Sequence, residues 1–380
     1  MNILLLFPGG VTPGGEEKII PALLALMKEL SRLHQVTVLL QRQDRQLREF
    51  TLHGCQVISL PYACAWGSLA LYAKQVKLAV GRLKFYRVIP EVIHSFWLGG
   101  PSVLAGLLGL IYRAPLVATL AGGEAVSLPG IGYGGSRHWR SRLVNRLSLA
   151  LADELTCGSR YVKEIAGLRW RKSFSLIPLP VDNALWSLVR VEEKDLMPKR
   201  KWQFVHLASI NRVKNPRLLL ALAAELVRRK CEFHLHWVGE DTLDDEMQRS
   251  ARESGLSSYI SFYGFQTQAQ LKPLMQEQDL IIQTSTFESQ GIAMAEAASQ
   301  GVCPVGTNVG WLHDLGLGIS TSVDMGESQV HHLADEILLL CREPKLRLER
   351  INKAQSWLMA HRADIVAGQF LAKYRELTSY

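Results

Sequence analysis

The sequence predicts an α/β protein of two domains, each built on a doubly wound parallel sheet with helices on both faces. Short apolar runs alternate with segments of helical periodicity along nearly all of the 380 residues, which is typical of parallel strands joined by crossover helices. The alternation is interrupted once, around residues 192–201, where the sequence becomes charged and loses its apolar period. A chain of this length also favours two domains of ordinary size.

The first series of elements begins with a continuous apolar run at residues 3–7, as expected for a buried parallel strand. A loop rich in Gly and Pro follows, and residues 17–33 then repeat apolar side chains at helical spacing. Further strands are expected at 35–40, 56–60, 92–95, 116–120, 154–157 and 174–178, and further helices at 101–110, 137–151 and 161–166.

The second series repeats the same alternation after the charged segment. Strands are expected at 203–208, 232–239, 260–262, 279–283 and 302–305, and helices at 216–229, 244–254, 268–276 and from 292 onward. Helices then continue from about residue 330, the last of them over 365–377. We therefore predict an N-terminal domain over 1–190, a C-terminal domain over 200–360 and a terminal helical segment over 361–380.

Composition narrows the class of protein. Hydrophobic residues make up 48% of the chain, enough for two cores, and the longest apolar stretch, 103–123, is broken by Arg113 and Pro115, so no membrane-spanning helix is expected. The start of the chain resembles a first strand rather than a signal peptide. Six scattered cysteines without zinc-type spacing indicate reduced thiols. We expect a cytoplasmic protein without a metal site.

Positive charge is concentrated in the first half. Residues 1–180 hold 21 Lys and Arg against 10 Asp and Glu, a balance of +11, whereas the whole chain carries +8. Basic residues cluster within 74–87 and 137–146, beside apolar side chains at helical spacing. Such a surface favours an anionic membrane, which would place the protein on the inner face of the membrane, and a merely soluble basic face is the alternative. No nucleic-acid motif accompanies the charge.

The most informative segment is residues 285–301, S-T-F-E-S-Q-G-I-A-M-A-E-A-A-S-Q-G. It joins two predicted strands, so it forms the turn and helix of a βαβ unit. The N–H groups that open such a helix bind phosphate, and Gly291 lets an anion approach the backbone. Glu296, one turn into the helix, is placed to accept hydrogen bonds from a ribose diol. Glu288 in the turn then faces the group that the diphosphate carries, which suits a nucleotide sugar.

Glu288 and Glu296, eight residues apart and followed by Gly301 and Gly310, resemble the E-x7-E block of retaining glycosyltransferases of family GT4. The resemblance implies the GT-B fold, with ligand between two Rossmann-like domains and a last helix that crosses back to the first domain. It also implies that Glu296 binds the donor ribose, that Glu288 contacts the donor sugar, and that Gln290, Gly291 and Ile292 border the nucleotide. Two solvated acids on a surface helix are the alternative.

The same resemblance assigns other positions. Lys214 matches the family's lysine that neutralises the leaving diphosphate, and Arg212 is the substitute for a family arginine whose place here is Ser209. Gly14 and Gly15 match a glycine loop that borders the donor diphosphate and the acceptor. The alternative for Gly14 and Gly15 is an ordinary turn between a strand and a helix. The alternative for Arg212 and Lys214 is that they are ordinary charged residues at the start of a helix.

Two further groups of positions are expected near the ligand. Phe265 and Gln266 follow a strand that lies near the nucleobase in the family. On the acceptor side the candidates are His94, which ends a strand, and the segment Gly122-Gly123-Glu124. That segment departs from the family, because Ala121 stands where many members have a histidine. A lone histidine such as His94 is more often a satisfied structural residue.

Together these features predict a metal-independent, retaining hexosyltransferase that uses a nucleoside diphosphate sugar, most often a UDP-sugar in this family, and needs no other cofactor. The acceptor would be a hydroxyl of a glycolipid, a polysaccharide or a small glycoside, including a lipid-linked one, as in polysaccharide biosynthesis. Two alternatives stay open. One is a GT-B phosphorylase or sugar-nucleotide epimerase. The other, suggested by Ala121 and Ser209, is a non-catalytic GT-B partner subunit.

Overall fold

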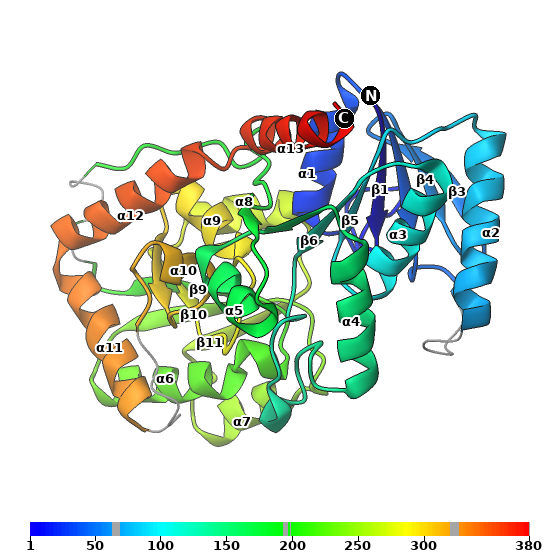
Figure 1. The fold of residues 1–380 in the computed structure, drawn as a ribbon. Helices are drawn as coiled ribbons and strands as arrows, with labels where there is room; N and C mark the ends of the chain where they lie inside the picture. Colours follow the sequence, from blue (N-terminus) through cyan, green and yellow to red (C-terminus); the bar gives the residue numbers. More distant parts are fainter. Residues whose placement is uncertain (63–68, 193–196, 198, 320–326, 380) are drawn as a thin grey trace. The chain divides into compact units, whose positions relative to one another are not determined.

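A computed structural model describes residues 1–62, 69–192, 197, 199–319 and 327–379 of the chain. The chain divides into two compact units (Figure 1). The first unit comprises Met1–Asp182 together with His361–Tyr380, and the second comprises Asn183–Ala360. The C-terminal segment therefore belongs to the first unit. Half of the segment expected as a linker, 192–201, lies outside the described residues.

The sheet of the first unit has eight strands within the described residues, in the order β3-β4-β2-β1-β5-β6-β7-β8. All neighbours run parallel except β3 and β4. The central strands β1, β5 and β6 are almost wholly buried, as parallel strands covered on both faces require. The strands are β1 Asn2–Phe7, β2 Gln35–Leu40, β3 Arg48–Leu52, β4 Cys55–Ser59, β5 Val92–Phe96, β6 Leu116–Leu120, β7 Glu154–Cys157 and β8 Ser175–Leu176.

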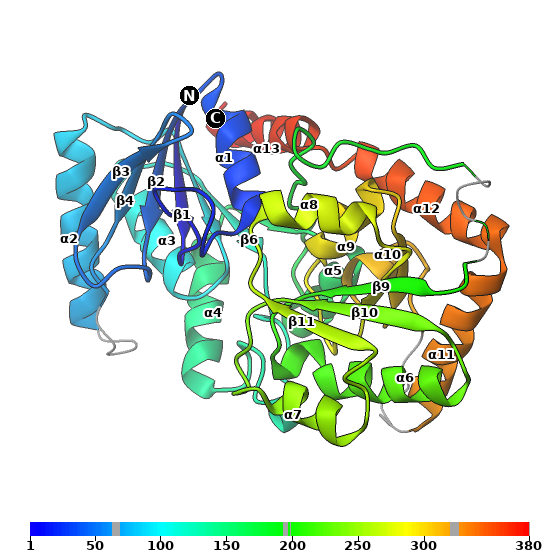
Figure 2. The same ribbon diagram turned by 180° about the vertical axis from the view of Figure 1, so that it is seen from behind.

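Helices pack on this sheet in two groups (Figure 2). Helix α1 packs against α13, whereas α3 packs against α2 and α4. The bounds are α1 Pro21–Ser31, α2 Leu69–Phe85, α3 Gly100–Tyr112, α4 Trp139–Leu151, α5 Arg160–Trp170 and α13 Ala363–Thr378, with a short 3-10 helix η1 at Pro129–Ile131. A core of leucine, isoleucine, valine and alanine side chains, including Leu4, Ile93 and Leu104, fills the space between the strands and helices α2 and α3.

The second unit repeats the architecture on a smaller scale. Its five-stranded parallel sheet has the order β11-β10-β9-β12-β13. The strands are β9 Trp202–Leu207, β10 Phe233–Val238, β11 Ile260–Gly264, β12 Leu280–Gln283 and β13 Cys303–Gly306. The helices are α6 Pro216–Arg228, α7 Glu246–Glu253, α8 Gln268–Gln276, α9 Ile292–Ser299, α10 Gly310–Asp314, α11 Glu327–Arg342 and α12 Pro344–Met359, and Arg212–Lys214 form the 3-10 helix η3.

The predicted α/β class with doubly wound sheets is confirmed, with one difference in the first unit. Strand β3 was not predicted, and it pairs antiparallel with β4 across a two-residue hairpin. His53 and Gly54 of that hairpin both have positive φ, 49° and 75°, as a type I′ turn requires. The pattern of β3 is weak because none of its residues is fully buried, and only the His-Gly dipeptide signals the turn.

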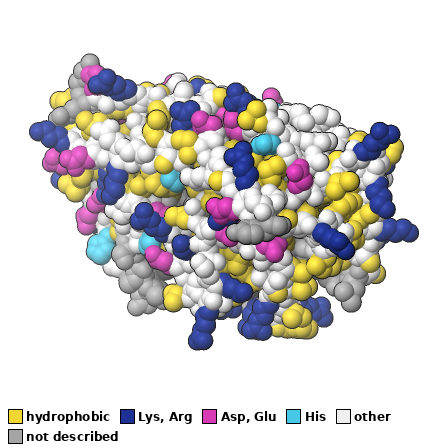
Figure 3. All heavy atoms as spheres, turned by 45° about the horizontal axis from the view of Figure 1, so that its top comes forward, with side chains coloured by type: hydrophobic (Ala, Val, Ile, Leu, Met, Phe, Trp, Pro, Cys, Tyr) yellow, Lys and Arg dark blue, Asp and Glu magenta, His cyan; other side chains and the backbone are white. Residues whose placement is uncertain are grey.

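The surface bears the excess of basic residues. On the face drawn in Figure 3, Lys and Arg side chains are spread among apolar and uncharged groups. Among the described helices, none combines the length and the apolar character that crossing a bilayer requires.

A buried chain of hydrogen bonds joins the C-terminal helix to the first sheet. The ring of His94, on β5, is wholly buried, with Nδ1 2.6 Å from the Tyr374 hydroxyl and Nε2 2.7 Å from Thr119 Oγ1. Thr119 in turn is 2.5 Å from Thr156 Oγ1 on β7. Burial lowers the pKa of His94 to about 3, so the ring is neutral and both nitrogens are used within the fold.

We predict that Tyr374→Phe destabilises the first unit by about 1–3 kcal/mol, because it leaves one nitrogen of His94 buried without a partner. Chemical unfolding followed by circular dichroism measures the change. Tyr72→Phe, at a half-buried position on α2, is the control and should leave the midpoint unchanged. Equal midpoints for Tyr374→Phe and the wild type would show that the hydroxyl contributes nothing.

Candidate active site

A small cavity lies at the carboxyl ends of β9 and β12, the two central strands of the second sheet. These strands are neighbours, but the chain runs outward from β9 to one edge before β12 starts the other half. Ligands bind at such a topological switch point in open α/β sheets. The cavity has a volume of about 70 Å³, room for several waters or one small polar group. Its lining includes His206, Lys214, Gln283, Ser285, Glu288, Gly291, Ile292 and Met294.

Two loops hold the charged residues of the cavity. In the first, Asn211 caps η3 by accepting a hydrogen bond from the Lys214 N–H, and Pro216 opens α6 immediately afterwards. The second loop, between β12 and α9, bonds to the first twice. Thr284 Oγ1 donates to the Lys214 carbonyl at 2.9 Å, and the Thr286 N–H donates to the Val213 carbonyl at 2.8 Å. The two loops therefore form one hydrogen-bonded platform.

Lys214 and Glu288 meet on this platform. Lys214 Nζ lies 2.6 Å from Glu288 Oε1, and the Ser285 hydroxyl donates to the same oxygen at 2.6 Å. The Lys214 and Glu288 side chains are 24% and 12% exposed, so the pair is shielded but reachable from the cavity. An ammonium group held in this way can also bind a phosphate oxygen, because it has three donors.

Glycines allow the platform to reach its shape. Gly291, which precedes α9, has φ of 91° and lines the cavity. Gly310 has φ of 54°, and a Cβ there would lie 2.7 Å from the Gln290 carbonyl and 2.8 Å from Glu288 Cβ. Both positions therefore need glycine, one for its dihedral angles and the other also for close packing behind Glu288.

Two polar atoms of the cavity have no hydrogen-bond partner among the described residues, His206 Nε2 and Gln283 Nε2. His206 Nδ1 is 2.8 Å from the Ile282 carbonyl and must donate to it, so the ring presents Nε2 as an acceptor. Burial lowers the pKa of His206 to about 4, which keeps the ring neutral. Unsatisfied polar groups at this depth are costly unless a ligand or water pairs with them.

Glu296 is not among the residues that line this cavity. It lies on the second turn of α9 and is 4% exposed. Its Oε1 accepts a hydrogen bond from Gln268 Nε2 at 3.3 Å, and Gln268 also accepts one from the Trp186 indole N–H at 2.6 Å. Burial raises the pKa of Glu296 to about 8, and the bond from Gln268 offsets only part of that effect. Among the described residues, Gln268 is thus the side-chain donor to Glu296. Further donors would stabilise the ionised form of this acid.

The other predicted residues of the second unit lie apart from the cavity. Arg212 is exposed on η3 and does not line it. Gln290 is buried, and its carbonyl accepts from the Trp311 N–H. Phe265 is 50% exposed on the loop after β11, where Gln266 Nε2 donates to the Tyr263 carbonyl. The exposed ring of Phe265 is available for stacking.

In the first unit, Gly14 and Gly15 lie in the loop after β1. Gly14 is exposed, with no atom within 4 Å of the place a Cβ would occupy, and Gly15 has φ of 65°. Gln43 fixes the start of this loop, because its Oε1 accepts from the Gly10 and Val11 N–H groups and its Nε2 donates to the Val11 carbonyl. The loop is thus anchored at one end and open around Gly14.

The acceptor-side candidates of the first unit are mostly engaged in its own structure. Glu124 is buried, and its carboxylate accepts from the N–H groups of Leu98, Ala121 and Gly122, the last at 2.9 Å. A Cβ on Gly122 would lie 2.8 Å from Trp97 Nε1, and one on Gly123 would lie 2.4 Å from the Tyr133 ring. With His94 bonded on both sides, these residues pack and position strand ends.

Sequence reasoning missed several members of the site. His206, Gln283 and Ser285 line the cavity, and Gln268 bonds to Glu296. Ser285 lies three residues before Glu288, and His206 lies near the end of a strand. These positions in the sequence are a weak indication that both residues belong to the site. Nothing in the local sequence connects Gln268 with Glu296. Among the described residues, no cluster of three His, Cys, Asp or Glu has the arrangement of a metal site.

Comparison with known proteins places this site in a family. The family model described as glycosyl transferases group 1 matches residues 190–357, and the model described as glycosyl transferase 4-like domain matches residues 19–172. The putative glycosyltransferase EpsF of Bacillus subtilis is 32% identical over 203 residues, which are 50% of this chain and 52% of EpsF. The chain thus spans about half the length of that relative.

Solved structures agree on the fold. The sucrose-phosphate synthase of Thermosynechococcus elongatus superposes with a TM-score of 0.77 at 18% identity, over 100% of both chains. Alr3699/HepE of Anabaena, crystallised with UDP and glucose, gives 0.69 at 18% identity, over 99% of this chain and 100% of that one. The fold is that of the GT-B glycosyltransferases, and the chain belongs to the group 1 family, GT4. The predicted family and fold are therefore confirmed.

We predict that Glu296 makes stability depend on pH. Because its pKa is raised from 4.5 to about 8 in the folded protein, the fold prefers the protonated acid. Its contribution is complete below pH 4.5 and is lost as the pH rises toward 8. Relative to Glu296→Gln, the wild type should lose stability between pH 5 and 8, by on the order of 1.4 kcal/mol per unit of pKa shift.

Chemical unfolding of both proteins across this pH range measures the difference. Glu253→Gln, at an exposed position on α7, is the control and should follow the wild type. Parallel curves for the wild type and Glu296→Gln would mean that burial does not raise the pKa of Glu296.

Proposed function

We propose that the chain is a retaining glycosyltransferase that takes its sugar from a nucleoside diphosphate donor, with UDP as the nucleotide. The observation that carries this proposal is the cavity at the β9/β12 switch point. There the cation of Lys214 and the start of α9 converge, and Glu296 lies one turn deeper. The Anabaena neighbour was crystallised with UDP-glucose, which supports this choice of donor.

In this proposal the diphosphate lies at the opening of α9, where the first N–H groups lack intrahelical acceptors and Gly291 permits close approach. Lys214 exchanges part of its interaction with Glu288 for a phosphate oxygen. Glu288, still held by Ser285, faces the donor sugar. The ribose diol donates to Glu296, and the exposed ring of Phe265 stacks on the base, with Gln266 beside it.

The chemical step would then depend on charge stabilisation and positioning. As the bond to the anomeric carbon breaks, negative charge develops on the departing phosphate, and Lys214 with the helix start stabilises it without a metal ion. Arg212 is near enough along the chain to add a second cation. The acceptor hydroxyl attacks on the face that the phosphate leaves and gives its proton to that phosphate, so the anomeric configuration is retained.

The acceptor would be a hydroxyl of a glycolipid, a polysaccharide or another glycoside. The loop of Gly14 and Gly15 in the first unit, open around Gly14, is the place we assign to it. The excess of positive charge in residues 1–180 would draw the first unit to an anionic membrane surface, where a lipid-linked acceptor resides. The protein would then act as a peripheral enzyme of the cytoplasmic leaflet.

We predict that Glu296→Ala weakens UDP binding roughly tenfold to a hundredfold, since the hydroxyls of the ribose lose their acceptor (about 1–3 kcal/mol). Hydroxyl donors favour the ionised acid, so UDP should also lower the pKa of Glu296 and release a proton near pH 7. Isothermal titration in two buffers of different ionisation enthalpy measures affinity and proton release together. If UDP bound both proteins with equal affinity, Glu296 would not bind the ribose.

We predict that Lys214→Met lowers the rate of sugar transfer by roughly 10²–10³, the usual effect of removing one group that stabilises transition-state charge. The assay measures UDP release from a panel of UDP-sugars without acceptor. Lys345→Met, at an exposed position on α12, is the matched control. Unchanged hydrolysis by Lys214→Met would exclude Lys214 from the step, and no turnover by the wild type with any donor would favour a non-catalytic protein.

A further inference from the structure

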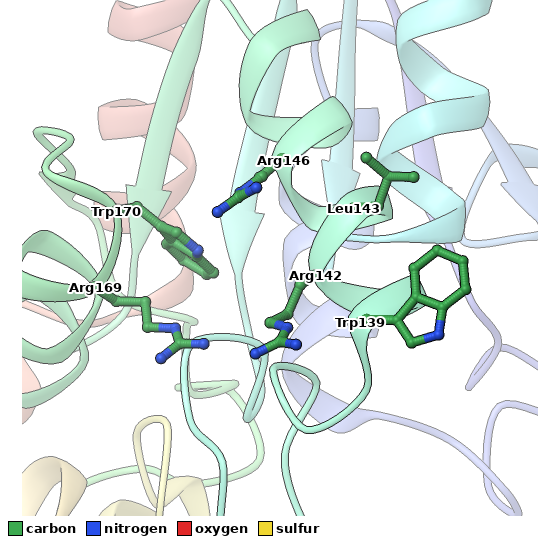
Figure 4. A pocket seen from close by; sticks show the side chains of 6 residues that line it. All are labelled: Trp139, Arg142, Leu143, Arg146, Arg169 and Trp170. Carbon is green, nitrogen blue, oxygen red and sulfur yellow. The ribbon is translucent and has the colours of Figure 1, made fainter.

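A second, larger cavity lies in the first unit between α4 and α5. It has a volume of about 620 Å³ and is lined by Trp139, Arg142, Leu143, Arg146, Arg169 and Trp170. Figure 4 shows Arg142 and Arg146 projecting from α4 toward Arg169 and Trp170 of α5, whereas Trp139 and Leu143 lie on the outer side of α4. None of these residues belongs to the proposed donor or acceptor site.

The charge of this cavity is unbalanced. Its described lining contains three guanidinium groups and no carboxylate. By contrast, Arg82 on α2 is bonded to Glu49, with Nε 2.6 Å from Oε1. Guanidinium groups that converge without an acid form a site for an anion, and their planar donors match the oxygens of a phosphate. Trp170 is anchored by contact with the buried ring of Phe174, at 6.2 Å between centroids.

An apolar stripe runs beside these arginines on α4. Trp139, Leu143 and Leu147 follow one another every fourth residue and are 64%, 60% and 47% exposed. Arg142 and Arg146 share the same spacing and form an adjacent stripe. A helix that exposes a Trp and Leu stripe next to a basic stripe is typical of helices that lie in the membrane interface.

We propose that the α4/α5 cavity binds the phosphate of an anionic phospholipid headgroup while Trp139, Leu143 and Leu147 enter the boundary of the acyl chains. The inference rests on the proposed attraction of the first unit to membranes and assigns it to one site. Nucleic acid also offers phosphates, but it has no apolar phase for the three exposed side chains. The combination of the two stripes therefore favours lipid.

Vesicle flotation at low ionic strength tests the charge. The wild type should float with vesicles of phosphatidylcholine and phosphatidylglycerol and not with phosphatidylcholine alone. Replacing Arg142, Arg146 and Arg169 together by Gln should weaken binding roughly a hundredfold, given the usual effect of each cation at such a surface. The matched control replaces Lys74, Lys77 and Lys84, exposed on α2, by Gln and should lose far less.

Brominated acyl chains test the insertion. They should quench part of the tryptophan fluorescence of the wild type, and Trp139→Phe should remove most of that quenching without abolishing flotation. All the substituted side chains are exposed or half-buried, and the single Arg→Gln variants form a graded series if the triple variant melts early. No flotation by the wild type, or equal losses in the α4/α5 and α2 variants, would overturn the proposal.

Two further measurements separate the alternatives. Binding to duplex DNA that depends on the same arginines, together with no quenching by brominated lipid, would assign the cavity to nucleic acid and overturn the proposal. Titration with UDP should give the same affinity for the wild type and the α4/α5 variants, because the donor cavity lies in the second unit. UDP binding without vesicle binding would therefore reject this inference alone, and vesicle binding without UDP binding would reject the proposed donor alone.

Discussion

The candidate site depends on one connection, the hydrogen bonds that tie the loop after β9 to the loop after β12. Lys214 and Glu288 are 74 residues apart in sequence and 2.6 Å apart in space. The carbonyls of Val213 and Lys214 in the first loop accept hydrogen bonds from the second loop. These bonds join the two loops independently of the ion pair. The ion pair is thus a consequence of the strand order, because only the switch point brings these two loops together.

The buried polar residues of the two candidate regions differ in their hydrogen bonding. In the first unit, both ring nitrogens of His94 and both carboxylate oxygens of Glu124 form hydrogen bonds. In the second unit, His206 and Gln283 each leave one nitrogen without a partner in the described part of the chain, both of them in the cavity. Since such groups cost stability when left alone, the cavity at the ends of β9 and β12 is suited to a ligand that pairs with both nitrogens.

Much of this could be predicted from the sequence, because strand and helix periods are local. The alternation of apolar runs defined both sheets, and the spacing of Glu288, Gly291 and Glu296 located the helix opening. Contacts between distant residues could not be predicted in this way. Nothing local pairs Gln268 with Glu296 or brings His206 and Lys214 to the same cavity. His94 has the pattern of a strand-end ligand, although Tyr374, 280 residues later, occupies one of its nitrogens.

Glu124 shows the same limit at shorter range. Its position after two glycines resembles a ligand-binding segment, yet its carboxylate turns back onto the N–H groups of its own turn and of Leu98. Strand β3 was missed for the opposite reason, since a half-exposed edge strand has no strong apolar period. Local patterns therefore identify the elements and the types of residues at their ends. They do not show which of those residues form their hydrogen bonds within the fold and are not available to a ligand.

The bond between Tyr374 and His94 has a consequence for biosynthesis. During translation, β5 leaves the ribosome long before the helix that carries Tyr374, and the whole second unit is made in between. Until α13 has emerged, the imidazole must be solvated or paired with something else, so the N-terminal sheet stays incompletely packed while the downstream unit is already free to fold. The nascent chain would therefore acquire its native order in reverse, with the later unit complete before the earlier one.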